Sequence, residues 1–507
     1  MPDFKSLTEN KYTFNDIFAK ASEGWLAVAL LCYPLAHIIH ILVFTFLNDE
    51  ALNGGNITDE KATIHFITTA EHPGDYLISI LFVTFTLAAV IGFIGIVSKL
   101  VSEKSDRTFC AEDSIPQLFM LLFVILAIIS VIINGIPREL LLGYTPRGEG
   151  FLSLMAYFLF FFIGSLIGKE KVKYIAVYAI MGVGLVNGVM VLVNKYIIDV
   201  PIQTFYPLAS VYYNINFYGY FLTILILLSA ALVLKETSKV RKIFVFVMLC
   251  MNSYILALNN TFGCFVACVV AFIFMLVADS ILKRKFSISA FVIFIVFLAI
   301  CLVTSFWYES FFTQILALFT DLKMIITDDE NAADAGTLRW GLWTNTMRYI
   351  KEKPFIGFGF EGVTERLRMD AGQDKVHNEY LEYAADFGVP ACLSYIIGLM
   401  VIYIKALVKK SKVDGATFCC LMGAFGYIGS AFFGNTMPFI APFFFIILGL
   451  ANTIGTAEKC KDPTLEPAEE SFADASEESY EAAEPEEEII EPEESDESAA
   501  DEIEITE

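Results

Sequence analysis

The residues of this sequence best suited to chemistry are an arginine and a histidine in one long segment, residues 307–387. Arg339 lies near the start of a predicted helix over 337–351, where free backbone N–H groups favour a phosphate. A guanidinium binds phosphate through two bonds and never deprotonates in proteins. His377 and Asn378 start a second predicted helix, and the helix dipole lowers the pKa of a histidine there. The neutral ring can then accept a proton near pH 7.

The first of these predicted helices separates its arginines onto different faces. Arg339, Trp343 and Thr346 share one face at 100° per residue, whereas Arg348 points to the opposite side. Only one of the two arginines can easily face a single site, and we select Arg339. Taken alone, His377 would more often be an interfacial histidine that only caps or hydrogen-bonds, so its assignment depends on the phosphate-binding candidate in the same segment.

Turns follow the first predicted helix. Pro354 ends it, and Gly357, Gly359 and Gly362 form the turns after it. The run GFGFEG matches a dinucleotide-binding pattern, but no core strand precedes it. The sequence therefore predicts a turn here and no dinucleotide site.

Two upstream clusters add polar residues. In YTPRGEG, residues 144–150, Arg147 and Glu149 lie on one tight turn, where they form either a structural salt bridge or a phosphate contact by Arg147 that Glu149 steadies. In YNINFYG, residues 213–219, the side chains of Asn214 and Asn216 can bind sugar hydroxyls or cap a helix. We expect capping for at least one of the two.

Hydropathy defines the elements that must position these residues. The chain has 507 residues, 56% of them hydrophobic, in charge-free blocks of about the length that spans a bilayer. We predict an all-α polytopic membrane protein of about twelve transmembrane helices, with a cytoplasmic N-terminus (1–23), a membrane domain (24–456) and a disordered acidic tail (457–507). The predicted spans are 24–47, 76–97, 116–134, 151–168, 174–194, 216–234, 243–258, 262–282, 288–306, 386–404, 416–434 and 439–454.

The placement of basic residues orients the predicted bundle. Lysines concentrate in alternate connections, which places both termini in the cytoplasm and the 307–387 segment outside, between the ninth and tenth spans. The arginines show the opposite bias. Outward arginines indicate either a phosphorylated ligand on the outer face or ordinary interfacial side chains. The six predicted outside are Arg138, Arg147, Arg339, Arg348, Arg366 and Arg368.

Together these clusters resemble the O-antigen ligase and polymerase family of membrane glycosyltransferases. The resemblance covers most of residues 120–450 and is sharpest over 337–400, where Arg339, a Trp-bearing helix, PFIGFG (354–359) and HNEYL (377–381) follow in order. YTPRGEG and YNINFYG look like the weaker upstream motifs of the family.

The resemblance implies a GT-C-type bundle with a large outer loop, and a glycan donor carried on undecaprenyl pyrophosphate. It implies that the histidine of the HN motif, His377, is the base on an acceptor hydroxyl, and that Arg339 holds the pyrophosphate. The anomeric centre is inverted without a metal ion or other cofactor. Asn378 then joins Asn214 and Asn216 as a substrate-binding candidate. The resemblance also implies a place in a bacterial inner membrane. It leaves the acceptor open as a lipid, a growing glycan, a wall polymer or a protein side chain, and it implies no nucleic acid.

The sequence departs from the family at one motif. Members often carry a Ser-Arg pair where this chain reads NNTFGCF, residues 259–265, which contains no arginine. The second phosphate ligand then falls to Arg147, with Arg366 and Arg368 as the next candidates.

Two other classes compete with a glycosyltransferase. A transporter or flippase of lipid-linked oligosaccharide would show two similar halves and charges at mid-membrane, and neither is visible in the sequence. A membrane scaffold that works through its acidic tail leaves the outer arginines and His377 without a role.

Overall fold

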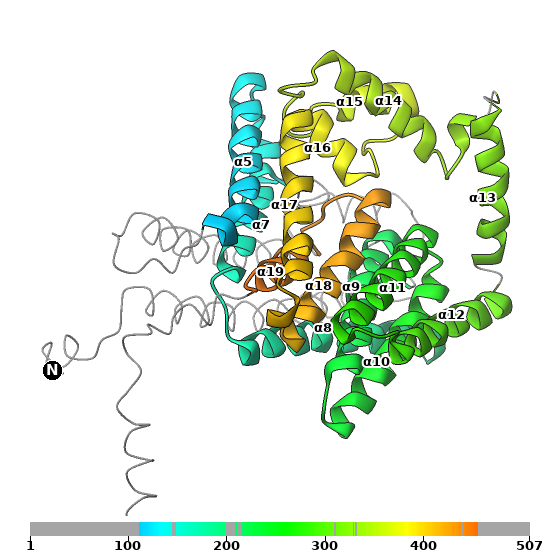
Figure 1. The fold of residues 1–507 in the computed structure, drawn as a ribbon. Coiled ribbons are helices and arrows are strands. Elements are labelled where there is room, and N and C mark those ends of the chain that lie inside the picture. The colour runs from blue at the N-terminus through cyan, green and yellow to red at the C-terminus, as the bar shows by residue number, and fades with distance from the viewer. Residues whose placement is uncertain are drawn as a thin grey trace, which may run out of the picture. The chain divides into compact units, whose positions relative to one another are not determined.

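The computed structural model describes residues 111–454, except 144–148, 198–207, 211, 213, 309–310, 328, 330–331 and 439. The predicted N-terminal segment, the predicted spans 24–47 and 76–97, Arg147 and the acidic tail lie outside the described residues. Within the described part, every regular element is a helix (Figure 1). The all-α prediction is therefore confirmed for this part of the chain.

Each span predicted between residues 116 and 454 corresponds to one helix. Eight of these helices are long and apolar enough to cross a bilayer, and α7 and α19 are shorter. The described part is therefore that of a polytopic membrane protein. The helices are α5 (Ala111–Asn134), α7 (Phe151–Gly164), α8 (Glu170–Tyr196), α9 (Ile215–Lys235), α10 (Lys239–Asn259), α11 (Phe262–Lys283), α12 (Ile288–Tyr308), α17 (Val389–Val408), α18 (Gly415–Ser430) and α19 (Ala441–Ala451).

Helix α9 forms the centre of the described bundle. It is apolar on all sides, and 83% of its most apolar 18-residue stretch is buried. Such burial is expected of a helix that is surrounded by other helices. Its neighbours are α8, α10, α11 and α18, while α17 packs on α5 and α19 packs on α7 (Figure 1).

The start of α9 is fixed by Asn214, whose side chain accepts the backbone N–H of Asn216 at 2.7 Å. The prediction that one of these asparagines caps the helix is confirmed.

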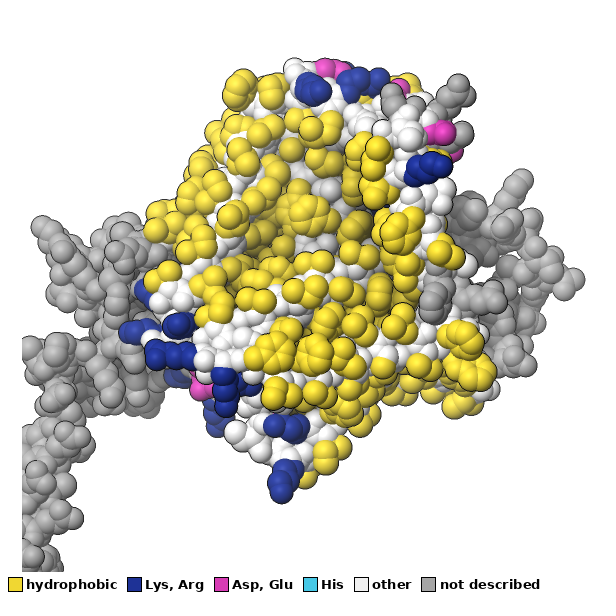
Figure 2. Space-filling model, turned by 45° about the vertical axis from the view of Figure 1, so that its right-hand side comes forward, with side chains coloured by type: hydrophobic (Ala, Val, Ile, Leu, Met, Phe, Trp, Pro, Cys, Tyr) yellow, Lys and Arg dark blue, Asp and Glu magenta, His cyan; other side chains and the backbone are white. Residues whose placement is uncertain are grey.

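One end of the bundle, here called the lysine end, carries buried ion pairs. Lys173 of α8 donates to Asp414 and Thr417 at the start of α18, at 2.8 Å each. Lys235 of α9 donates to Asp279 of α11 at 2.8 Å. Figure 2 shows charged side chains gathered at the upper and lower ends of the molecule, with hydrophobic side chains over the surface between them. This apolar band is what a lipid bilayer would cover.

The opposite end, here called the loop end, holds the segment 307–387, which folds into further helices. They are α13 (Phe311–Ile326), a 3₁₀ turn (Ala332–Asp334), α14 (Arg339–Glu352), α15 (Thr364–Ala371) and α16 (Glu379–Phe387). The predicted helix over 337–351 is confirmed as α14, and it ends two residues before Pro354 as expected.

Close backbone approach ties the loop end to the membrane helices. The turn at Gly357 passes so near α16 that an added Cβ would lie 2.4 Å from the carbonyl oxygen of Asp386. Ser130 of α5 donates to that same carbonyl oxygen at 2.8 Å. The side chain of Asn134, at the end of α5, donates to the Gly357 carbonyl at 3.3 Å. These contacts hold the turn after α14 and the end of α16 against α5.

Candidate active site

Arg339 is the first residue of α14 and follows a sharp left-handed turn. Thr337 and Leu338 have φ values of 58° and 68°, a region that non-glycine residues seldom occupy. The Nη1 group of Arg339 donates to Thr337 Oγ1 at 2.7 Å and to the Gly336 carbonyl at 3.3 Å. Two consecutive strained residues beside a functional candidate are typical of positions where a side chain must be held in one direction.

The two faces of α14 match the prediction. Thr346 is fully buried, Arg339 and Trp343 are half-buried, and Arg348 is exposed. The indole ring of Trp343 packs against the ring of Phe433, with centroids 6.4 Å apart. Arg339 therefore lies on the side of α14 that faces the bundle.

Arg339 lies near two membrane helices, α9 and α11. Its guanidinium is within electrostatic range of Tyr220 of α9 and of Cys264 of α11. The Tyr220 hydroxyl donates to the Phe433 carbonyl at 3.0 Å. At Gly434, an added Cβ would lie 2.3 Å from the Tyr220 ring, so only glycine allows this approach. The segment from Phe433 onward thus passes between the start of α9 and the start of α14.

His377 is fixed by the same segment. Its backbone N–H donates to Asn435 Oδ1 at 2.9 Å, and its φ of 55° is again left-handed. Asn378 follows as the N-cap of α16, where its side chain accepts the Leu381 N–H at 3.0 Å. Phe433 contacts Tyr220 and Trp343, which lie near Arg339. Asn435, two residues later, contacts His377. Both predicted catalytic residues therefore lie near one short stretch of chain.

The four arginines of the segment 307–387 differ in their partners. Arg348 pairs with Asp370, Arg366 pairs with Glu352 at 2.6 Å, and Arg368 pairs with Glu365 at 2.5 Å. Arg339 has no carboxylate within 4 Å among the described residues. Its Nε atom is also buried without a hydrogen-bond partner in that part of the chain. A buried cationic donor left in this state is costly unless an anion binds there.

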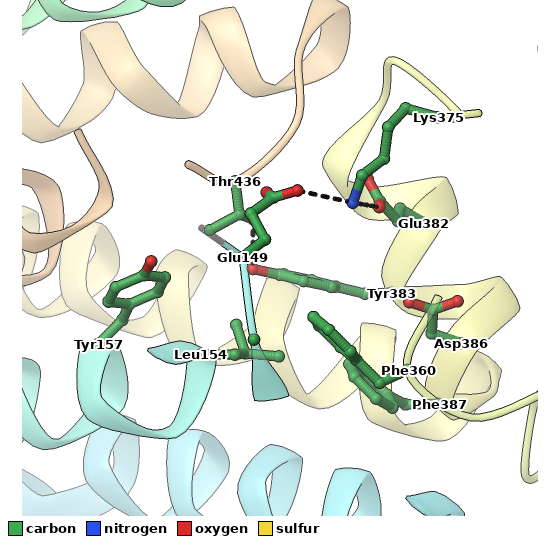
Figure 3. Close-up of a pocket in the computed structure, with 11 residues that line it drawn as sticks. Glu149, Leu154, Tyr157, Phe360, Lys375, Glu382, Tyr383, Asp386, Phe387 and Thr436 are labelled. Atoms are coloured by element: carbon green, nitrogen blue, oxygen red, sulfur yellow. Dashed lines mark hydrogen bonds and ion pairs between the residues drawn. The ribbon is translucent and has the colours of Figure 1, made fainter. Parts of the chain in front are cut away.

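Glu149 has a partner that the sequence analysis did not consider. It pairs with Lys375 at 2.9 Å, and Lys375 also pairs with Glu382 at 2.9 Å (Figure 3). Lys375 pairs with Glu361 as well, at 3.0 Å. The expected neighbour, Arg147, lies outside the described residues. Burial, followed by repulsion from Glu382 and Glu361, raises the pKa of Glu149 to about 7, although Lys375 opposes the change.

A small cavity lies beside this ion cluster. Its lining includes Glu149, Tyr157, Glu382, Asp386 and Thr436 (Figure 3). Its free volume of about 30 Å³ is room for one or two waters and not for a sugar. Among the described residues, no group of three or more His, Cys, Asp or Glu side chains could hold a metal ion.

Glu379, the residue after Asn378, anchors α16 without any cation. Its carboxylate accepts the hydroxyl of Tyr395 of α17 at 3.0 Å and that of Tyr427 of α18 at 2.9 Å. Burial raises the pKa of Glu379 to about 7, and the tyrosine hydrogen bonds offset part of the shift. Thr436, one residue after Asn435, also bonds Glu379. Glu379 therefore braces both the helix after His377 and the segment beside it.

The pKa of Glu379 predicts a pH effect on stability. The folded carboxyl binds its proton more tightly than the unfolded one, so stability is greatest at low pH and falls between about pH 4.5 and 7. We expect Glu379→Gln, which resembles the protonated acid, to remove up to about 3 kcal/mol of this loss. Melting temperatures in one detergent at pH 5 and pH 7.5 measure the difference. Glu365→Gln, at an exposed ion pair, is the control, and an unchanged pH slope in Glu379→Gln would contradict the assignment.

Five residues that hold the site together were not predicted from the sequence: Lys375, Glu361, Glu382, Glu379 and Asn435. The acidic and basic residues lie close to the GFGFEG and HNEYL motifs in the sequence, which was the available signal. Asn435 lies between two predicted spans, in the run FFGNTMP. A polar residue in this short connection was a weaker signal.

The fold and the site define a class of protein: a polytopic helical membrane protein with an arginine and a histidine held at one end of the bundle. Residues 244–396 match the family model described as O-antigen ligase, a range that runs from α10 into α17 and contains both Arg339 and His377. The match supports a place for this chain in the O-antigen ligase/polymerase family, and with it a role as a surface polysaccharide ligase or polymerase. No curated protein matches the chain.

Proposed function

We propose that this protein transfers a glycan from an undecaprenyl-pyrophosphate carrier to an acceptor hydroxyl, with inversion and without a metal ion. In this proposal the loop end faces outward, and both chain termini are cytoplasmic. The observation that carries the proposal is the state of Arg339, a half-buried guanidinium without a carboxylate partner among the described residues. Trp343, on the same face of α14, packs on Phe433, two residues before the Asn435 that holds His377.

The chemistry divides between these two residues. His377 removes the proton from the acceptor hydroxyl as the oxygen attacks the anomeric carbon of the donor glycan. The bond from that carbon to the pyrophosphate oxygen breaks, and the lipid pyrophosphate leaves. Arg339 stabilises the negative charge that develops on this leaving group. A lipid or wall acceptor makes the enzyme a ligase, and a growing glycan makes it a polymerase.

We assign the second phosphate contact to Arg147. Arg366 and Arg368, the other candidates, are each held by a glutamate on the surface of the loop end. Glu149, two residues after Arg147, is anchored to Lys375, which lies two residues before His377. Asn214 and Asn378 use their side chains as helix caps, so among the predicted asparagines we assign the sugar contact to Asn216.

Reconstitution tests the proposed reaction. The full-length protein is placed in vesicles with lipid-linked glycan extracted from cells that lack this gene, together with candidate acceptors. We expect a new glycosidic bond and release of lipid pyrophosphate, at a rate that EDTA does not change. Movement of the donor across the vesicle without a new bond would instead identify a flippase and contradict the proposal.

A further inference from the structure

The ion cluster around Lys375 joins three separate parts of the loop end. Its carboxylates come from Glu149 before α7, from Glu361 in the turn between α14 and α15, and from Glu382 in α16. All three lie within 3.0 Å of one ammonium nitrogen, and Lys375 is only 4% exposed. A single lysine side chain therefore fixes the relative position of three chain segments.

The cluster contains more acid than base. Asp386 is a fourth buried carboxyl beside it. Its Oδ2 accepts the Glu361 N–H at 3.0 Å, and its Oδ1 is without a hydrogen-bond partner among the described residues. Burial and the nearby Glu382 raise the pKa of Asp386 well above its usual range. Burial alone would lower the pKa of Lys375, but the glutamates hold it well above its usual value. In the described part of the chain, Lys375 is thus the cation that these carboxyls face.

The cluster acts directly on the backbone that carries His377. Lys375 lies two residues before the histidine, and His377 has a left-handed backbone that needs support from its surroundings. Asn435 holds the histidine N–H, and Asn378 caps the helix that follows. Lys375 anchors the residues that precede His377, through its pairs with Glu149, Glu361 and Glu382. Its pair with Glu149 at 2.9 Å ties the residues before His377 to the segment before α7.

We propose that Lys375 is a positioning residue for catalysis, which places His377 by locking its loop to Glu149, Glu361 and Glu382. The inference rests on the proposed function, because it takes His377 as the base. It adds a residue outside the donor-binding and proton-transfer machinery. The lock lies two residues from His377, whereas it reaches Arg147, the second proposed donor contact, only through Glu149. Its loss therefore changes the rate of transfer more than the affinity for the donor, which Arg339 still holds.

The test compares Lys375→Met with Lys375→Arg in the full-length protein. We expect Lys375→Met to lower kcat about tenfold or more, because small displacements of a catalytic group are costly. The KM for the lipid-linked donor should stay within about twofold, and Lys375→Arg should recover most of the rate because it keeps the charge. Lys351→Met, at an exposed lysine of α14, is the matched control. A wild-type kcat in Lys375→Met, or a loss confined to the donor KM, overturns the inference.

Two further variants keep the test decisive. If Lys375→Met does not fold, the double variant Lys375→Met/Glu382→Met removes one charge of each sign and is measured in its place, with the same kcat and KM criteria. His377→Asn is assayed beside it. Full transfer activity in His377→Asn refutes the assignment of His377 as the base, on which the inference rests, whereas absence of any new glycosidic bond with the wild-type protein refutes the proposed function itself. An inactive His377→Asn with wild-type kcat in the lysine variant refutes only the role of Lys375.

Discussion

Replacing His377 with asparagine is expected to lower kcat for glycan transfer about 10²–10⁴-fold, the usual contribution of a positioned general base. Asparagine is the informative substitution because His377 has a φ of 55°. Asparagine tolerates the left-handed region, whereas alanine there adds a backbone cost of about 1 kcal/mol. His377→Asn therefore removes the base and keeps the turn. The measurement is the initial rate of glycosidic bond formation at saturating donor and acceptor.

A matched control separates the base from the backbone. Arg284, at the end of α11, is also a left-handed non-glycine residue, with a φ of 54°, and it is exposed at the lysine end. Arg284→Asn makes the same kind of change away from the proposed site and should keep wild-type kcat. If both variants transfer glycan at the wild-type rate, His377 is not the base.

Replacing Arg339 with lysine is expected to lower kcat/KM about 10²–10³-fold, the range seen when one charge-stabilising donor is removed from a transition state. Lysine keeps the positive charge but loses the planar fork that binds phosphate through two bonds. It also loses the Nη1 contact with Thr337 that directs the side chain. The measurement is kcat/KM for the lipid-linked donor.

Arg348→Lys on the same helix is the matched control for Arg339→Lys. Arg348 is exposed and pairs with Asp370 on the surface, so we expect kcat/KM to change less than about twofold. Equal losses in the two variants would indicate that α14 needs arginine for folding. An unchanged kcat/KM in Arg339→Lys would remove Arg339 from the donor site.

The helices of the described part could be predicted from the sequence because each depends on local signals. Apolar runs of bilayer-spanning length predicted ten spans from residue 116 onward, and each corresponds to one helix. The end of α14 before Pro354 and the cap of α9 at Asn214 follow from single residues. The faces of α14 follow from helical periodicity alone.

The partners of the charged residues could not be predicted in the same way. In the sequence, Arg339 and Arg348 differ only in position along a helix. The structure separates them because Asp370 reaches Arg348, and that contact depends on how α15 folds back. Lys375 illustrates the same limit, since its three glutamates are brought together only by the fold. The left-handed turn at His377 likewise depends on Asn435, far along the chain.

The missing Ser-Arg pair can also be interpreted from the structure. The segment NNTFGCF lies at the start of α11, where Cys264 is within electrostatic range of Arg339. Asn259 of that segment donates to the backbone of Leu208 and Ile215, at 2.9 and 3.0 Å, and so helps to hold the start of α9. The segment thus supports the neighbourhood of Arg339, which is consistent with a second phosphate contact supplied from elsewhere, as we propose for Arg147.

A single-turnover measurement on His377→Asn tests the central claim most directly. The variant is loaded with labelled lipid-linked glycan, unbound donor is removed, acceptor is added, and the label in bound donor and in product is followed. If Arg339 binds the donor and His377 activates the acceptor, the variant will retain the donor and form almost no glycosidic bond. Product formation at the wild-type rate from the bound donor would contradict this account.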